Sequence, residues 1–153
     1  MPCSSICDWH ATYGVDARND ANWTARTRRL YVVHWHEHRA VKVGVEATKG
    51  RGRITKWRRT GATLVAVWEV RDPGDVDACR SMFQAEQECL AVLRGLYEHP
   101  PHAEWVVVVG PNQYDPGRAD GATETFTAEV DDVLRRVDDV VARFPALIRR
   151  RVH

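Results

Sequence analysis

The segment Leu30–Val45, with the sequence LYVVHWHEHRAVKVGV, decides the fold that we expect for this chain. Residues 30–36 and 40–46 are rich in β-branched and aromatic side chains, and the short polar segment EHR separates them. Such a pattern predicts two antiparallel strands joined as a hairpin. Tyr31 and Lys42 stand among the valines of these strands, so the register of the hairpin decides whether the two meet.

Two registers of this hairpin are open from the sequence. Side chains alternate between the faces of a strand, so Lys42 and Gly44 lie on the face opposite to the valines of the second strand. A connection with an even number of residues places Tyr31 on the face of Lys42 and Gly44, and an odd number reverses the grouping. The even register places the Tyr31 hydroxyl, the Lys42 amine and the backbone of Gly44 close together. Periodicity alone leaves open the alternative of a core tyrosine and a solvated lysine.

The rest of the chain predicts helices and further strands around the hairpin. In chain order we expect a basic helix over 48–61 with Thr48 as N-cap and Gly61 as its end, a strand over 63–70, a helix over 75–98, a strand over 104–110 and a helix over 127–144. The order β-β-α-β-α-β-α predicts an α+β fold. Its sheet is mainly antiparallel, has three or four strands and is flanked by helices.

Length and composition predict one soluble domain. The 153 residues fit a single compact unit. We expect an irregular N-terminal extension at 1–28, the domain at 29–145 and a basic tail at 146–153. No apolar run approaches the ~20 residues that a membrane helix needs. The first ten residues lack a basic segment followed by an apolar one, so we expect no secretory signal and a cytoplasmic protein.

The charge is unevenly distributed although the formal net charge is only +1. Residues 18–59 contain twelve Lys or Arg and three acidic residues, whereas residues 60–140 contain six and sixteen. A basic first third can supply a surface that neutralises nucleic-acid phosphates. The alternative is that basic and acidic faces solvate the fold or pair with each other.

The four cysteines predict reduced thiols in a chain without a signal peptide. Cys3, Cys7 and His10 could together hold zinc, but their C-x3-C-x2-H spacing is not a common zinc pattern and no second half follows nearby. Cys79 lies on the apolar face of its helix, where packing explains it.

Three histidines at alternate positions, His34, His36 and His38, resemble a ladder of metal ligands. In the even register they point away from Tyr31 and Lys42. We therefore interpret them as residues of the hairpin tip or of the second face, and a transition metal bound there would form a separate site.

Glu86 is the strongest single candidate for a functional residue. The buried face of the helix over 75–98 carries Cys79, Met82, Leu90 and Leu93 at helical spacing, and Glu86 falls on that face. A carboxylate on an apolar stripe is costly unless a cation, a metal or a hydrogen bond satisfies it. The alternative is a structural ion pair with an arginine.

The basic helix carries the candidate phosphate ligands. Ile54 and Trp57 mark its inward side, and Arg53 borders that side closely enough to reach across the sheet. The planar guanidinium of an arginine can hold two phosphate oxygens at once. Four further basic residues of this segment are candidates to contact a nucleic-acid backbone: Arg51, Lys56, Arg58 and Arg59.

Five short motifs occur here in an order and spacing similar to that of the GIY-YIG nuclease superfamily. They are RLYVV, KVG, RITKW, AEQECL and TETF, and the resemblance covers the chain from about Leu30 to Val137. A Thr-Glu-x-Phe signature and a lysine in the second motif resemble a phage and bacterial subgroup of this superfamily. Arg29 stands in the place of the first motif's glycine, and Lys42 in the place of the second motif's tyrosine.

The resemblance implies a site for phosphodiester hydrolysis. Tyr31 and Lys42 would flank the attacking water, and Lys42 could accept a proton only if its pKa falls. Arg53 would hold the non-bridging oxygens. Glu86 would carry one Mg²⁺ or Mn²⁺, and Glu124 would contribute on the substrate side or serve packing.

We therefore expect a Mg²⁺-dependent endonuclease that acts on DNA. Two alternatives remain open at this point. The fold could serve thiol-dependent chemistry on a small molecule through Cys3 or Cys7, or it could be a binding module without catalysis. The joint presence of Tyr31, Arg53 and Glu86 argues against the binding module, because binding alone does not need a buried metal carboxylate.

Overall fold

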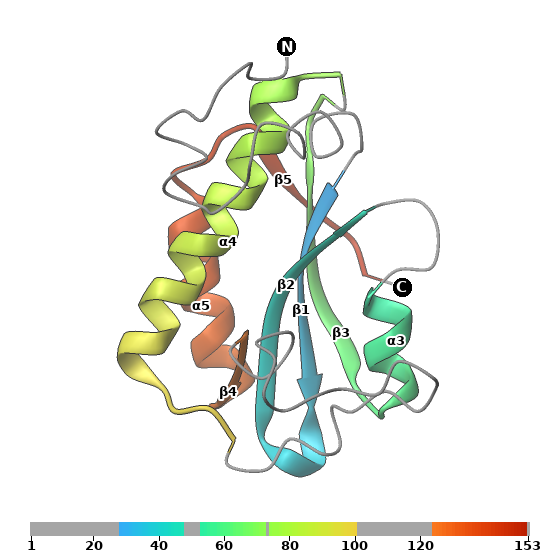
Figure 1. Ribbon diagram of the computed structural model, residues 1–153, viewed down its shortest axis with the longest axis vertical. Helices are drawn as coiled ribbons and strands as arrows, with labels where there is room; N and C mark the ends of the chain where they lie inside the picture. The colour runs from blue at the N-terminus through green and yellow to red at the C-terminus, as the bar shows by residue number, and fades with distance from the viewer. Residues whose placement is uncertain (1–27, 48–52, 73, 101–123, 153) are drawn as a thin grey trace, which may run out of the picture.

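The computed structural model describes residues 28–47, 53–72, 74–100 and 124–152. In these residues the chain forms β1 (Arg28–Trp35), a 3-10 turn (His36–His38), β2 (Ala40–Ala47), α3 (Arg53–Arg59), β3 (Thr63–Val70), α4 (Val76–Leu96), β4 (Thr125–Thr127), α5 (Val130–Val141) and β5 (Leu147–Arg150). Helices α4 and α5 lie on one side of the sheet and α3 on the other (Figure 1). The expected α+β fold with an antiparallel sheet is confirmed.

The hairpin adopts the even register. Trp35 pairs with Ala40, so four residues connect the strands, and Arg39 closes the turn with a left-handed φ of 49°. Tyr31 consequently pairs with Gly44 and lies on the face of Lys42. The other face of this hairpin carries the valines of β2.

The sheet has five strands, against the three or four expected, in the order β4-β2-β1-β3-β5, and all neighbours are antiparallel. Its central strand is β1. The strand β5 pairs with β3 and lies within 146–153, the segment that the sequence suggests as a basic tail. The strand β4 overlaps the end of the TETF segment and pairs with the first three residues of β2. The strand expected over 104–110 and the extension before residue 28 lie outside the described residues.

The helices follow the expected patterns with shorter bounds. The Asp75 side chain accepts hydrogen bonds from the backbone N–H groups of Asp77 and Ala78 and so caps α4. Gly61, with a φ of +97°, follows α3, as expected for its end. The expected N-cap Thr48 lies outside the described residues. None of the helices in the described part of the chain is long and apolar enough to cross a membrane.

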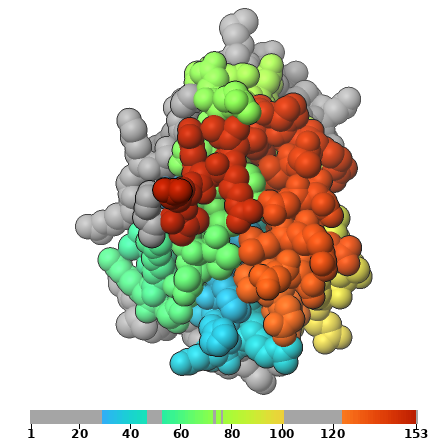
Figure 2. Space-filling model, turned by 180° about the vertical axis from the view of Figure 1, so that it is seen from behind, coloured from blue at the N-terminus to red at the C-terminus, as the bar shows by residue number. Residues whose placement is uncertain are grey.

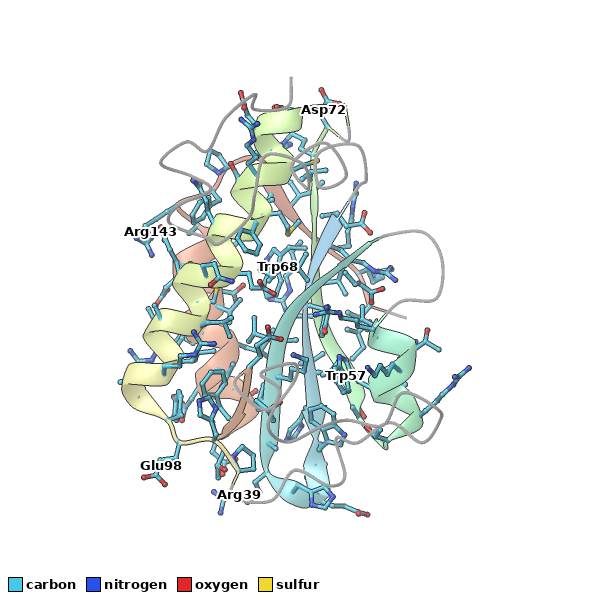
Figure 3. All side chains as sticks on the ribbon, in the orientation of Figure 1. Arg39, Trp57, Trp68, Asp72, Glu98 and Arg143 are labelled. Atoms are coloured by element: carbon cyan, nitrogen blue, oxygen red, sulfur yellow. The ribbon has the colours of Figure 1, made fainter. Side chains whose placement is uncertain are left out.

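Two hydrophobic clusters hold the sheet between its layers. The larger one joins the valine face of the hairpin to α4 and α5, and it includes the apolar stripe of α5, whose buried members are Val133, Val137, Val140 and Val141. The smaller cluster joins the other face to α3 and contains Tyr31, Val33, Trp35, Ile54 and Trp57. Figure 3 shows Trp68 and Trp57 in the two separate layers. Of the predicted catalytic residues, Tyr31 belongs to the smaller cluster, whereas Glu86 lies on α4 in the other layer.

The Tyr31–Gly44 pair leads to a prediction about stability. A Cβ atom added to Gly44 would lie 2.5 Å from Tyr31 Oη and 2.7 Å from its Cζ, so the tyrosine would have to move. We expect Gly44→Ala to destabilise the protein by about 1–3 kcal/mol, the usual cost of overpacking. Chemical denaturation measures this cost.

Gly95→Ala is the control, because a Cβ at Gly95 in α4 would meet nothing within 4 Å. It should be neutral or stabilise the helix by up to about 1 kcal/mol. Equal stabilities of the two variants would contradict the close packing of Tyr31 on Gly44.

Candidate active site

Tyr31 belongs to β1, the central strand of the sheet, and is the first residue of the candidate site. The side chain is fully buried on the α3 side of the sheet, and Trp57 Nε1 donates a hydrogen bond to Tyr31 Oη over 2.8 Å. Burial raises the pKa of Tyr31 far above its usual value, and the Trp57 hydrogen bond and the Arg53 charge oppose only part of this rise. The hydroxyl therefore keeps its proton. Since Trp57 donates to its oxygen, that proton remains available for another acceptor.

Lys42 lies next to it with no exposed surface. Pairing of Lys42 with Thr125 brings the preceding residue, Glu124, to the lysine, and Lys42 Nζ donates a hydrogen bond to the Glu124 carboxylate. Lys42 Nζ also lies 5.2 Å from the centroid of the Trp57 ring. Burial lowers the pKa of Lys42, and the Glu124 carboxylate acts in the opposite direction. Lys42 is thus a desolvated amine whose protonation depends on one ion pair.

Glu86 projects from α4, which packs against β1 and β2. It is 5% exposed, and Gln87 Nε2 donates a hydrogen bond of 3.1 Å to Glu86 Oε1. Burial, assisted by the negative charge of Glu124, raises the pKa of Glu86 to about 7, although Lys42 and Arg53 act to lower it. The buried position expected from the apolar stripe is thus found. The structure gives Glu86 no ion pair with an arginine in the described part of the chain.

Arg53 is the first residue of α3 and is exposed to solvent. Its charge contributes to the pKa of Tyr31, Lys42 and Glu86, which places it in the same electrostatic cluster. Arg53 and Glu124, whose side chain is 18% exposed, are the two residues of this cluster that reach solvent, whereas Tyr31, Lys42 and Glu86 are buried.

Glu46 positions the start of α3, a role that the sequence did not indicate. This carboxylate is 4% exposed, accepts a hydrogen bond of 2.9 Å from the Ile54 backbone N–H, and forms an ion pair of 3.3 Å with Arg29. The strand period places Glu46 on the face of Lys42, but its partners are distant in sequence. Glu46 thus anchors the turn that carries Arg53.

Lys42 and Glu124 form an ion pair, and the charges of Arg53, Glu86 and Glu124 act on the pKa of Tyr31. The structure therefore brings five of the predicted residues near one another: Tyr31, Lys42, Arg53, Glu86 and Glu124. The proposed backbone-contacting residues Lys56, Arg58 and Arg59 are exposed on α3. Arg51 lies outside the described residues. The same holds for the possible zinc ligands Cys3, Cys7 and His10.

The histidines and the described cysteines do not join this site. His34 pairs with Val41 on the opposite face, and His36 and His38 lie in the exposed turn, as the even register predicts. Cys79 and Cys89 are buried, and burial raises the pKa of Cys89 to about 12, which makes it a poor nucleophile. The thiol-dependent alternative rests on residues that are not described.

The carboxylates fit a hard divalent cation bound together with a substrate. No group of three or more His, Cys, Asp or Glu side chains suited to a metal occurs among the described residues. Mg²⁺ commonly binds through one or two carboxylates and completes its coordination with water and phosphate oxygens. Glu86, a buried carboxylate influenced by a second carboxylate at Glu124, meets this requirement.

Comparison with known proteins found no matching family model, no similar curated protein and no similar solved structure. The resemblance to the GIY-YIG nucleases consequently stays a prediction, and function is argued from the site.

The raised pKa of Glu86 predicts a pH-dependent effect of Glu86→Gln. Between about pH 4.5 and pH 7 the carboxyl ionises in the unfolded chain but keeps its proton in the folded one, so rising pH costs the wild type stability. Because one pKa unit corresponds to about 1.4 kcal/mol, the glutamine variant should gain on the order of 3 kcal/mol relative to the wild type across this range. Urea denaturation at pH 5 and pH 8 measures the difference.

Glu88→Gln provides the matched control for this measurement. Glu88 lies on the same helix, but its side chain is 40% exposed and forms a surface ion pair with Arg143. A constant difference between Glu86→Gln and wild type at both pH values would show that Glu86 titrates normally.

The Trp57–Tyr31 hydrogen bond predicts an energetic coupling between the two side chains. Trp57→Phe and Tyr31→Phe each leave a buried partner unsatisfied, whereas the double variant removes both polar groups. A double-mutant cycle on the free energy of unfolding should give a coupling of about 1 kcal/mol. Additive single effects would show that this bond contributes nothing to stability.

Proposed function

We propose that this protein is a Mg²⁺- or Mn²⁺-dependent phosphodiesterase that cleaves DNA at the site formed by Tyr31, Lys42, Arg53, Glu86 and Glu124. One observation carries the proposal. A nearly buried carboxylate, Glu86, with a pKa of about 7, shares one cluster with a desolvated lysine and an exposed arginine. Perturbed ionisable groups of both signs in one place are typical of catalytic sites.

Each side chain has a role that its environment supports. Arg53 binds the non-bridging oxygens, because its guanidinium is exposed and always charged. The protonated Tyr31 donates a hydrogen bond to the attacking water or to the phosphate. Lys42 is the candidate proton acceptor, since burial lowers its pKa, and it can act in this way once its ion pair with Glu124 opens.

Glu86 would hold the divalent cation, with Glu124 beside it. When bound, such a cation neutralises charge that develops on the phosphoryl oxygens and polarises the phosphorus centre. The protein's own side chains orient the groups that contact the phosphate and the water. Glu46 fixes the start of α3 and with it Arg53, and Trp57 fixes the Tyr31 hydroxyl.

The arrangement of the strands supports the resemblance noted in the sequence. The segments that resemble the motifs of the GIY-YIG superfamily are distant along the chain, yet their polar residues meet at one site. A similar fold does not by itself imply the same activity, so catalysis needs a direct test.

Nicking of supercoiled plasmid tests the proposal. With Mg²⁺ or Mn²⁺ the wild type should convert the plasmid to open-circular and linear forms, and EDTA should stop this reaction. Glu86→Gln should lose at least about a hundredfold in rate, as expected for a metal-binding carboxylate. Glu88→Gln, with an equal charge change on the same helix, should cleave like the wild type.

Three results would overturn the proposal. They are the absence of cleavage with either metal, cleavage that persists in EDTA, and equal loss of activity in Glu86→Gln and Glu88→Gln. Circular dichroism of each variant separates a loss of activity from a loss of fold.

A further inference from the structure

A second set of basic residues, far from α3 in sequence, lies on the same side of the sheet. The last residues of the chain continue from β5, and Val152 packs against the smaller cluster that contains Ile54 and Trp57 of α3. Figure 1 shows the C-terminus beside α3, and from behind the dark red C-terminal residues lie between α5 and α3 (Figure 2). The chain end is therefore held next to the basic helix.

The strand pleat separates the arginines of this segment. Arg149 turns toward α5, where it lies over the Trp68 ring at 5.5 Å and pairs with Asp138. Arg150 turns to the other face and pairs with Glu69 at 3.3 Å, with its side chain 51% exposed. Arg151 is exposed and has no acidic partner in the described part of the chain. Arg150 consequently lies on the side of α3, and the exposed Arg151 stands between it and Val152, which holds the chain end against the smaller cluster.

The outward side of α3 adds four basic side chains and no acidic one: Arg53, Lys56, Arg58 and Arg59. The opposite layer differs, because α5 and the residue before it carry five carboxylates: Glu129, Asp131, Asp132, Asp138 and Asp139. A protein with this polarity turns its basic side toward a polyanion and its acidic side away.

We propose that Arg150 and Arg151 extend the basic side of α3 into one surface that binds the phosphate backbone of a nucleic-acid duplex. This inference rests on the proposed function for the identity of the polyanion. It adds the C-terminal residues to the binding surface and selects duplex over single strand. The surface, which we call the α3–C-terminal face, consists of Arg53, Lys56, Arg58, Arg59, Arg150 and Arg151.

The choice of a duplex follows from the aromatic residues. Proteins that bind single strands stack the bases on exposed aromatic side chains. Trp57, the aromatic residue of α3, is 3% exposed and faces the sheet. The only large hydrophobic residue with high exposure in the described segments is Leu96, which lies on α4. Among the described residues the α3–C-terminal face thus offers charge for phosphates and no exposed aromatic side chain for stacking, which favours backbone binding without base recognition.

Fluorescence anisotropy with a short labelled duplex in EDTA tests this surface, because binding is then measured without cleavage. Arg150→Ala/Arg151→Ala should lower the duplex affinity several-fold and reduce the slope of log Kd against log salt by about 1 per arginine. The wild type should bind the duplex more tightly than either of its single strands.

Arg135→Ala/Arg136→Ala is a matched control on α5. Both pairs contain one arginine in a surface ion pair, Arg150 with Glu69 and Arg135 with Asp132. The control removes the same charge from the opposite layer, so duplex binding should stay within about twofold of the wild type, as for a charge outside the contact. Arg151→Ala alone keeps the ion pair of Arg150 with Glu69. A loss of affinity in this single variant therefore cannot come from a fold weakened by loss of that ion pair.

The outcomes separate this inference from the proposed activity. Equal effects of the two double variants, an unchanged affinity of Arg150→Ala/Arg151→Ala, or preference for single strands would overturn the binding surface even if plasmid is nicked. Duplex binding that depends on these arginines, together with the absence of nicking, would support the surface and overturn the activity.

Discussion

The contact of Tyr31 with the bare backbone of Gly44 is the constraint on which the site depends. A side chain at that position would meet the tyrosine ring, so the hairpin can keep its register and bury Tyr31 only with glycine opposite. The same register places Lys42 on the α3 side of the sheet and the valines of β2 on the other side. One pairing thus divides the side chains of the hairpin between the layer of α3 and the layer of α4 and α5.

Much of the fold could be predicted because its longer elements carry local signals. The strand Thr63–Val70 has the expected bounds, the hairpin differs by at most two residues at each end, and α4 and α5 show their apolar stripes in the sequence. The short strands β4 and β5 could not be placed in this way. A strand of three residues has almost no period, and the two arginines of LIRR give β5 the composition of a solvated tail. Both exist because an edge of the sheet offers hydrogen bonds to them.

The candidate site, like the fold, could be predicted from the sequence only where the signal is local. The helical stripe predicts that Glu86 faces inward, and the even register groups Tyr31 with Lys42, because each signal is contained in about ten residues. Periodicity alone did not decide between a buried and a solvated Lys42. Side-chain hydrogen bonds of the site join residues that are distant in sequence, such as the one that links Lys42 to Glu124, 82 residues later. Glu46 illustrates the limit, since its position on the strand is predictable but the helix start that it anchors is not.

The balance of charge in the site distinguishes its two carboxylates, Glu86 and Glu124. A buried ionised group needs a partner, and Glu124 has one in Lys42. Glu86 is more deeply buried, and among the described residues its carboxylate receives one hydrogen bond, from Gln87. It is therefore the less compensated of the two, which is why its pKa rises while Lys42 remains engaged with Glu124. A divalent cation would add positive charge at Glu86, which has no ion pair in the described part of the chain although the charges of Lys42 and Arg53 act on it.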